Sequence, residues 1–275
     1  MEKEYDQLIE EHYRKVAEKH GLSPASTMED SIMREKETDA IVRFVSVSLQ
    51  EHFTGRTVRI MDIGCGNGYT LEVLHNLFPG QQYTGIEKSN DLRALAEARF
   101  AGCGDVQIFP GDIRQPGFNQ NLHADILICQ RVIINLLNAA DQRKALQNIL
   151  DCTAGRSDER PASLLLFIEG YSAPFERLNT AREELGLEPI APAYHNLYLA
   201  DDFFETPALK PFSTPQIAPQ NFLSTHYFLT RVFFPYHTQG KPFKRNSEFV
   251  SFFSQALPEN VGDYSPVKIY SFEKA

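Results

Sequence analysis

Three glycines at alternate positions, Gly64, Gly66 and Gly68, follow an apolar run and an acid, Asp62, in the segment VRIMDIGCGNGYT (58–70). Without a Cβ atom, glycine lets backbone N–H groups approach a ligand closely. An apolar run, a glycine turn and residues that can begin a helix predict a strand-loop-helix unit. We therefore expect this loop to hold a small molecule.

Polar side chains also follow later apolar runs of the chain. Glu87 ends the run 82–87 and lies 19 positions after Gly68, while Asp112 and Gln130 follow the runs 106–109 and 124–130. In open parallel sheets, ligands bind beyond the carboxyl ends of the strands, and an acid at the second strand accepts ribose hydroxyl protons. The spacing predicts a cofactor that contains a nucleoside.

Two cofactor classes fit a glycine loop with a ribose-binding acid. Dinucleotide dehydrogenases use GxGxxG and place a pyrophosphate at the helix N-terminus, whereas this loop reads GxGxG with Asp62 two residues before it. An acid there suits a cationic ligand without phosphate, which favours S-adenosylmethionine. A nicotinamide-dependent oxidoreductase is the alternative.

The surrounding pattern alternates strands and helices, which predicts an α/β fold with a parallel sheet and right-handed crossovers. Strands are expected at 58–63, 82–87, 106–109, 124–130 and 163–168, and helices at 31–51, 69–78, 90–100 and from Asn138 to about residue 150. Residues 1–20 predict an amphipathic helix that acts as a lid or as a dimer element.

After Gly170, prolines and aromatic residues interrupt the alternation. We expect an insertion over the open end of the sheet at 171–210, an edge strand at 214–223, an aromatic helix or strand at 224–240 and a final strand at 265–273. The whole chain, 1–275, is interpreted as one domain with an N-terminal helical cap (1–55), a cofactor-binding core (56–170) and a substrate-side C-terminal part (171–275).

Composition narrows the function. The 275 residues are 42% hydrophobic, which is enough for one large core. The absence of a long apolar run or a signal-like N-terminus predicts a soluble, cytoplasmic protein without a membrane partner. A formal net charge of -9 argues against nucleic acid as a partner. The four cysteines lie singly, so we expect no zinc site and no metal.

The motifs MDIGCGNGYT, YTGIEKS, GDI and DILICQRVIINL, in that order, resemble those of class I S-adenosylmethionine-dependent methyltransferases over about residues 58–170. The resemblance implies a Rossmann-like, mostly parallel sheet of seven strands with helices on both faces and an antiparallel last strand. The segments ASTMEDSIMREKE, LNTAREELGLEPI and HNLYL more loosely resemble a subgroup in small-molecule and surface-sugar biosynthesis.

The family pattern implies a role for each matching residue. The backbone of Gly64, Cys65, Gly66 and Gly68 would bind the methionyl part of the cofactor, with Asp62 anchoring the loop or the amino group, and Glu87 would bind the ribose. Asp112 and Ile113 would border the adenine, Lys88 would flank the ring or ribose, and Gln130 and Arg131 would lie beside the sulfonium.

The acceptor side rests on weaker signals. Methyl transfer requires alignment of the nucleophile and, where needed, removal of its proton. His195 is the preferred general base because its pKa lies near neutrality, and Glu169 and Asn135 are further candidates for contact with the acceptor. Each of the three has a purely structural alternative, as a loop residue, a hydrogen-bonding partner or a helix cap.

Other polar residues are candidates for substrate binding, with solvated surface or core packing as the alternative for each. They are Arg34, Asn196, Tyr198 and Arg231, with Lys241, Lys244 and Arg245 facing an acidic acceptor and Ser26, Thr27 and Met28 closing over the cofactor. Arg34 would pair either with the carboxylate of the cofactor or with an acidic acceptor. We expect methyl transfer to O or N of a small, sugar-derived acceptor. A protein that binds S-adenosylmethionine without catalysis is the remaining alternative for the function. A homodimer is one option for the oligomeric state.

Overall fold

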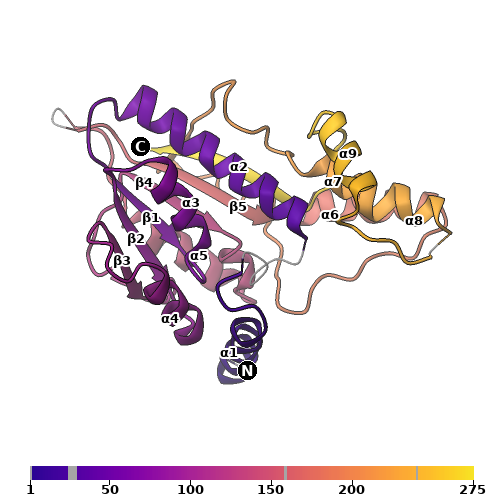
Figure 1. Ribbon diagram of the computed structural model, residues 1–275, viewed down its shortest axis with the longest axis horizontal. Coiled ribbons are helices and arrows are strands. Elements are labelled where there is room, and N and C mark those ends of the chain that lie inside the picture. Colours follow the sequence, from indigo (N-terminus) through magenta and orange to yellow (C-terminus); the bar gives the residue numbers. More distant parts are fainter. Residues whose placement is uncertain (1, 24–29, 158–159, 240) are drawn as a thin grey trace.

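A seven-stranded mixed sheet forms the centre of the computed structural model, which describes residues 2–23, 30–157, 160–239 and 241–275 (Figure 1). The strand order is β3-β2-β1-β4-β5-β7-β6. The strands are β1 (Arg59–Ile63), β2 (Gln82–Glu87), β3 (Val106–Pro110), β4 (Ile126–Gln130), β5 (Leu164–Gly170), β6 (Leu209–Pro211) and β7 (Val267–Lys274). Strands β1 to β5 pair in parallel, and β7 is antiparallel to both β5 and β6.

Helices alternate with the first strands, as the sequence predicts. The α-helices are α1 (Glu2–His20), α2 (Ser31–Val47), α3 (Tyr69–Leu77), α4 (Asn90–Arg99), α5 (Ala139–Leu150), α6 (Ser172–Glu184), α7 (Ser224–Tyr227), α8 (Phe234–His237) and α9 (Glu248–Ala256). Shorter helical segments are η2 (Ser48–His52), η3 (Ile133–Asn135) and η4 (Phe228–Phe233). The fold expected from the sequence, a Rossmann-like sheet with N-terminal helices, is confirmed.

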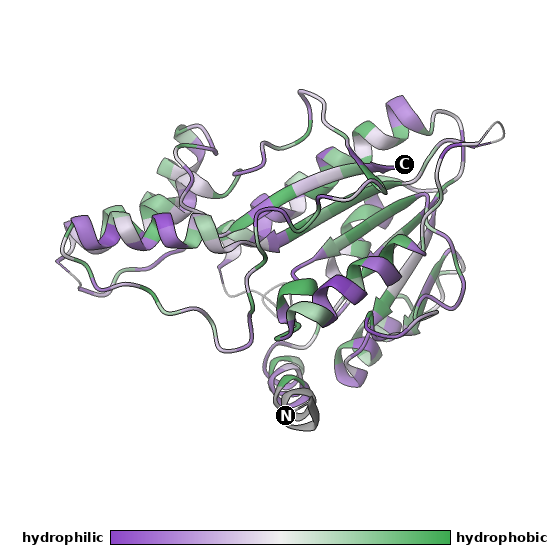
Figure 2. Ribbon diagram, turned by 180° about the vertical axis from the view of Figure 1, so that it is seen from behind, coloured by the Kyte–Doolittle hydropathy of each residue, from purple (hydrophilic) through white to green (hydrophobic). Residues whose placement is uncertain are grey.

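Alternation along the central strands produces a core on each face of the sheet. Ile126 and Ile128 of β4 pack in the cluster that includes Phe44 of α2, whereas Leu127 and Cys129 pack in the cluster on the opposite face. Successive strand side chains point to opposite faces, so strands buried on both faces are apolar throughout. Figure 2 shows these strands mainly in green, with purple on the helices that cover them.

Local capping fixes where several helices begin. Asn138 accepts a hydrogen bond from the N–H of Ala140 (2.8 Å) at the start of α5, as predicted, and Asp30 accepts one from Met33 (3.2 Å) at the start of α2. Side chains at this position satisfy backbone donors that have no partner inside the helix. The start of α2 matters for function because this helix supplies two charged residues of the site described below.

The C-terminal part differs from the prediction. The proposed edge strand at 214–223 is wrong: these residues form turns, and the edge strand is β6, at Leu209–Pro211. Pro215 and Pro219 lack the N–H groups that a strand ladder needs. The segment 224–240 is helical from Ser224 to His237, which decides between the two forms that were left open. The expected insertion begins with a regular helix, α6, and helix α9 was not anticipated.

Candidate functional site

The loop after β1 is shaped for close approach. The N–H of Gly64 donates to the carbonyl of Ile86 (2.7 Å), which fastens the loop to β2. Gly64 has a φ of 69°, and a Cβ atom there would clash with the side chain of Val132. Gly68, also left-handed, is the residue immediately before α3. A residue with a side chain would therefore move this loop away from β4.

Glu87, at the end of β2, holds the middle of the same loop. One carboxylate oxygen accepts from the N–H of Gly66 (2.9 Å) and the other from the N–H of Ser89 (2.7 Å). Burial raises the pKa of Glu87, although the backbone hydrogen bonds oppose the shift. Each carboxylate oxygen can accept more than one hydrogen bond, so Glu87 can still receive hydroxyl groups of a ligand.

Asp62 lies beside Glu87 and is also buried. Burial and the neighbouring Glu87 raise the pKa of Asp62 to about 8, and Arg34 acts in the opposite direction. A buried carboxylate is stable in its charged form only when a cation or hydrogen-bond donors compensate it. The pair of acids therefore favours a ligand that brings a positive charge.

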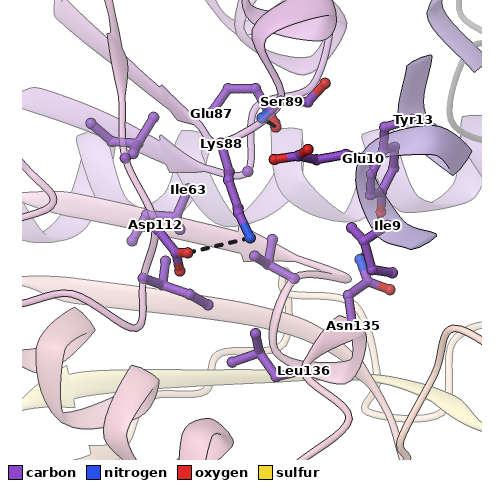
Figure 3. Close-up of a pocket in the computed structure, with 15 residues that line it drawn as sticks. Ile9, Glu10, Tyr13, Ile63, Glu87, Lys88, Ser89, Asp112, Asn135 and Leu136 are labelled. Atoms are coloured by element: carbon purple, nitrogen blue, oxygen red, sulfur yellow. Dashed lines mark hydrogen bonds and ion pairs between the residues drawn. The ribbon is translucent and has the colours of Figure 1, made fainter. Parts of the chain in front are cut away.

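The cavity beyond the strand ends has two lobes. The apolar lobe is lined by Ile9, Glu10, Tyr13, Ile63, Gly64, Ile86, Glu87, Lys88, Ser89, Gly111, Asp112, Ile113, Val132, Asn135 and Leu136 (Figure 3). The charged lobe is lined by Tyr13, Arg34, Asp62, Gly64, Cys65, Gly66, Asn67, Tyr69, Thr70, Glu87, Leu92, Gln130, Arg131 and Val132. The two lobes adjoin one another, because four residues border both: Tyr13, Gly64, Glu87 and Val132.

Asp112 borders the apolar lobe in a different electrostatic setting. Its carboxylate accepts from the guanidinium of Arg114 (3.0 and 2.6 Å) and lies 3.4 Å from the ammonium of Lys88, an ion pair drawn in Figure 3. Burial acts to raise the pKa of Asp112, but the Arg114 hydrogen bonds and the charge of Lys88 outweigh burial and hold the pKa at about 2. Asp112 is therefore a carboxylate at neutral pH, beside the apolar wall that Ile113 contributes.

Gln130 ends β4 and Arg131 follows it at the charged lobe. Both side chains donate to the carboxylate of Glu37 in α2, with Arg131 Nε at 3.1 Å from Oε1. Glu37 is fully buried. Burial acts to lower the pKa of Arg131, but Glu37 outweighs it and raises that pKa. Sequence reasoning missed Glu37, although a carboxylate between Met33 and Ile41 on the apolar face of a helix was a visible signal.

Arg34, one turn before Glu37 along the chain, also reaches the charged lobe. Its side chain is buried, and its guanidinium lies over the ring of Tyr69, 5.6 Å from the ring centre. Arg34 is close enough to Asp62 for the two charges to influence one another. The charged lobe thus presents a carboxylate and a guanidinium together, which suits a ligand with both an ammonium and a carboxylate.

Helix α1 covers the cavity from outside the sheet. Ile9, Glu10 and Tyr13 face Glu87, Lys88 and Asp112 across the apolar lobe in Figure 3. The amide of Asn135 donates to the phenolic oxygen of Tyr13 (2.7 Å) and to the carbonyl of Arg131 (2.8 Å). Asn135 thus joins the lid to the turn that follows β4. Tyr13 is another residue that sequence reasoning did not assign to the site.

The segment after α1 is fastened to the glycine loop. The amide of Asn67 donates to the carbonyls of Gly21 (3.0 Å) and Ser23 (3.1 Å). Arg99 donates to the carbonyls of Asn67 (2.9 Å) and Leu22 (2.6 Å). The C-terminal end of the lid is therefore fixed to the loop it covers.

Glu169 lies outside both lobes. Its carboxylate accepts hydrogen bonds from the N–H groups of Val132 (3.0 Å), Ile133 (2.9 Å) and Ile134 (3.1 Å), and the residue is fully buried. Burial raises its pKa to about 7, against the backbone hydrogen bonds. This geometry favours the structural alternative, in which Glu169 shapes the turn that carries Asn135.

His195 lies against the lid, outside the residues that line the two lobes. Its ring stacks on that of His12, with 4.7 Å between the centroids, and burial lowers the pKa of His195. Tyr194 contacts the same lid histidine through its hydroxyl (3.0 Å). The role of His195 as a base stays a prediction.

The other residues predicted to bind substrate are spread around the lid and the C-terminal helices. Tyr198 packs on Phe175, and burial raises its pKa to about 12; Arg131 and Tyr227 also act on that pKa. Asn196 lies in the same loop, where its side-chain oxygen is buried. Arg231 lies over the ring of Tyr227 at 4.5 Å and pairs with Asp30 at 3.2 Å.

The basic residues at 241–245 line neither lobe. Lys241 and Arg245 line a separate groove with Arg182, Tyr236 and Phe243, and Lys244 is exposed. Ser26, Thr27 and Met28 lie outside the described residues. Within the described ranges, no group of three or more His, Cys, Asp or Glu side chains gathers to hold a metal, and no helix is long and apolar enough to cross a bilayer.

Comparison with known proteins identifies the same region. Residues 60–155 match the family model of a methyltransferase domain. Trans-aconitate 2-methyltransferase from Yersinia pseudotuberculosis is 42% identical over 65 residues, 23% of this chain and 24% of the relative. Malonyl-[acyl-carrier protein] O-methyltransferase from Bacillus anthracis is 42% identical over 43 residues, 16% of each chain. The match thus spans about a quarter, or less, of the length of these curated relatives.

Solved structures extend the likeness over most of the fold. Magnesium protoporphyrin IX methyltransferase from Synechocystis PCC 6803, with bound SAH, superposes with a TM-score of 0.53 and 12% identity over 88% of this chain and 85% of that chain. The plantazolicin methyltransferase, in complex with SAH, gives a TM-score of 0.52 and 13% identity over 95% and 90%. At these identities the likeness concerns the fold alone. Residues 60–155 thus form a methyltransferase domain, and the fold of the chain is that of methyltransferases solved with bound SAH, which supports a class I S-adenosylmethionine-dependent methyltransferase.

Proposed function

We propose that the two-lobed cavity binds S-adenosylmethionine and that the protein transfers its methyl group to O or N of a small-molecule acceptor. One observation carries this proposal: the charged lobe presents Asp62 and Arg34 together, while the adjoining lobe is largely apolar. S-adenosylmethionine has an amino acid at one end and a nucleoside at the other. The two chemistries of the cavity match the two ends of this cofactor.

The residues fit each part of the cofactor. Asp62 would pair with the ammonium and Arg34 with the carboxylate of the methionyl part, Glu87 would accept the ribose hydroxyls, and Ile113 and Leu136 would enclose the adenine beside Asp112. When bound, the cofactor supplies a methyl group activated by a positively charged sulfur. The protein would position the acceptor, exclude water and accept the proton that the acceptor releases.

A nicotinamide dinucleotide fits the same cavity less well. Its pyrophosphate would lie at the glycine loop, where the carboxylates of Asp62 and Glu87 are already close enough for Glu87 to raise the pKa of Asp62. Adding two negative charges there would increase the repulsion. Mixing the protein with NADH should therefore leave the fluorescence of the nucleotide unchanged.

The acceptor would approach the methyl group from the side of Arg131, Asn135 and Tyr198. The names of two relatives describe methylation of trans-aconitate and of malonyl-[acyl-carrier protein], the latter at oxygen, which supports an oxygen acceptor. The looser resemblance to surface-sugar biosynthesis supports a sugar-derived one. His195 remains the proposed base, and a His195→Ala variant with wild-type turnover would remove it from the mechanism.

Calorimetry with S-adenosylmethionine and S-adenosylhomocysteine tests the first part of the proposal. We expect both ligands to bind. If neither ligand binds at high micromolar concentration, the proposal is contradicted. Product assays across a panel of hydroxylated, carboxylated and amino-sugar acceptors test the second part. Cofactor binding without release of S-adenosylhomocysteine across that panel would favour a protein that binds the cofactor without catalysis.

A further inference from the structure

Tyr13 stands where the two lobes of the cavity meet. It borders both lobes, as do Gly64, Glu87 and Val132. Those three residues follow or end strands of the sheet, whereas Tyr13 comes from α1, on the opposite side of the cavity (Figure 3). Tyr13 is thus the side chain of the lid that closes over the junction.

A hydrogen bond fixes the phenolic end of Tyr13. The amide of Asn135 donates to the tyrosine oxygen (2.7 Å), and the same amide donates to the carbonyl of Arg131 (2.8 Å). Asn135 belongs to η3, whose turn the carboxylate of Glu169 holds in place through backbone hydrogen bonds. The ring of Tyr13 is therefore positioned by the core of the protein as well as by its own helix.

The covalent structure of the proposed cofactor places its sulfur at this junction. The sulfur joins the amino acid part to the nucleoside part, so it must pass between the charged lobe and the apolar lobe. We infer that Tyr13 contacts the positively charged sulfur of S-adenosylmethionine and positions it for transfer. This inference rests on the proposed function.

An aromatic ring and a phenolic oxygen both present negative charge density to a nearby cation. S-adenosylmethionine carries a positive charge on sulfur, whereas the product S-adenosylhomocysteine has a neutral thioether at the same place. A contact with Tyr13 should therefore favour the substrate form of the cofactor over the product. This preference can be measured without knowledge of the acceptor.

The experiment compares dissociation constants for S-adenosylmethionine and S-adenosylhomocysteine, measured by calorimetry on the full chain. Tyr13→Leu keeps apolar bulk on the lid but removes the ring and its oxygen. We expect it to weaken binding of S-adenosylmethionine about three- to tenfold more than binding of S-adenosylhomocysteine, the range of a partly desolvated cation and ring. Tyr13→Phe removes only the oxygen and should lower the preference by about twofold.

Ile9→Ala is the matched control, because Ile9 lies one helical turn before Tyr13 and borders only the apolar lobe. It should weaken both ligands by the same factor. Equal weakening of both ligands by Tyr13→Leu would overturn the inference; if Tyr13→Leu does not fold, an unchanged preference in Tyr13→Phe would overturn it. Failure of the wild-type protein to bind either ligand would overturn the proposed function as well.

Discussion

Asp62 and Asp112 are two aspartates at neighbouring edges of one cavity, and their environments shift their pKa values in opposite directions. Asp112 receives hydrogen bonds from Arg114, two residues further along, and its pKa is held at about 2. Asp62 faces Glu87, and its pKa is raised to about 8. The charge of Asp112 is already balanced by Arg114 and Lys88, whereas the charge of Asp62 is balanced only in part, by Arg34.

The difference separates a structural carboxylate from one that favours a ligand. An ion pair formed within the chain lowers the affinity of the carboxylate for a further cation, because its charge is already balanced. A buried carboxylate beside another acid gains more from an incoming ammonium. This difference supports the proposal that the charged end of the cofactor binds beside Asp62 and the uncharged nucleoside beside Asp112.

Of the substitutions that test this comparison, the removal of Glu87 should change cofactor affinity most. Glu87→Ala removes the proposed ribose acceptor, and we expect the affinity for S-adenosylhomocysteine to fall by about 1.5 to 3 kcal/mol, the range of charged hydrogen bonds. Calorimetry measures the change, and thermal melting monitors the loss of the Gly66 hydrogen bond. Glu97→Ala, at an exposed partner of Arg93, is the control. Unchanged affinity in Glu87→Ala would reject the ribose role.

Cofactor binding should depend on pH through Asp62. Because the pKa of Asp62 is about 8 in the structure, the residue must release a proton before it can pair with the ammonium of the ligand. Affinity for S-adenosylhomocysteine should therefore rise from pH 6 towards pH 8, by at most about tenfold, or 1.4 kcal/mol, per pH unit. Calorimetry in buffers of different ionisation enthalpy detects the released proton. A slope as steep in Asp62→Asn as in the wild type would contradict the assignment.

Asp112 should stabilise the folded protein above about pH 4. Its pKa of about 2 lies below the ordinary value near 3.9 of the unfolded chain, so its stabilising contribution is present above pH 4 and is lost as the pH falls towards 2. Asp112→Asn should lower the free energy of unfolding at pH 7 by about 1 kcal/mol, because the ion pairs are partly exposed to solvent. Urea denaturation measures the change. Asp202→Asn, at an exposed pair with Arg143, should have almost no effect and serves as control.

The cofactor half of the fold could be predicted because its signals are local. The apolar run before Gly64, the cap at Asn138 and the spacing of the glycines each lie within a few residues of the structure they determine. The C-terminal half could not be predicted as well. β6 has only three residues and is set by its pairing with β7, more than fifty positions away, and neither its length nor its partner leaves a periodic pattern.

The site residues also divide into those that local motifs predict and those that only the folded chain brings together. Motif positions located Asp62, Glu87 and Asp112 at the cavity, but Glu37 and Tyr13 come from helices far away in the sequence. Glu37 contacts Arg131 across 94 positions, so only the folded chain shows that contact. Glu169 lies near the end of a strand, where the motifs predict functional side chains. Its carboxylate, however, accepts hydrogen bonds from three backbone N–H groups in the turn after β4, and only the folded chain brings that turn to Glu169.

The attachment of residues 21–23 to Asn67 and Arg99 has a consequence for the exchange of cofactor. Because the segment after its C-terminal end is fixed to the glycine loop, we expect α1 to move outward at its N-terminal part first, around the side of the cavity where we propose that the methionyl part binds. This movement would uncover the nucleoside first and would break the hydrogen bond between Tyr13 and Asn135 and the contacts of His12 with Tyr194 and His195, so the residence time of a bound ligand should depend on these contacts.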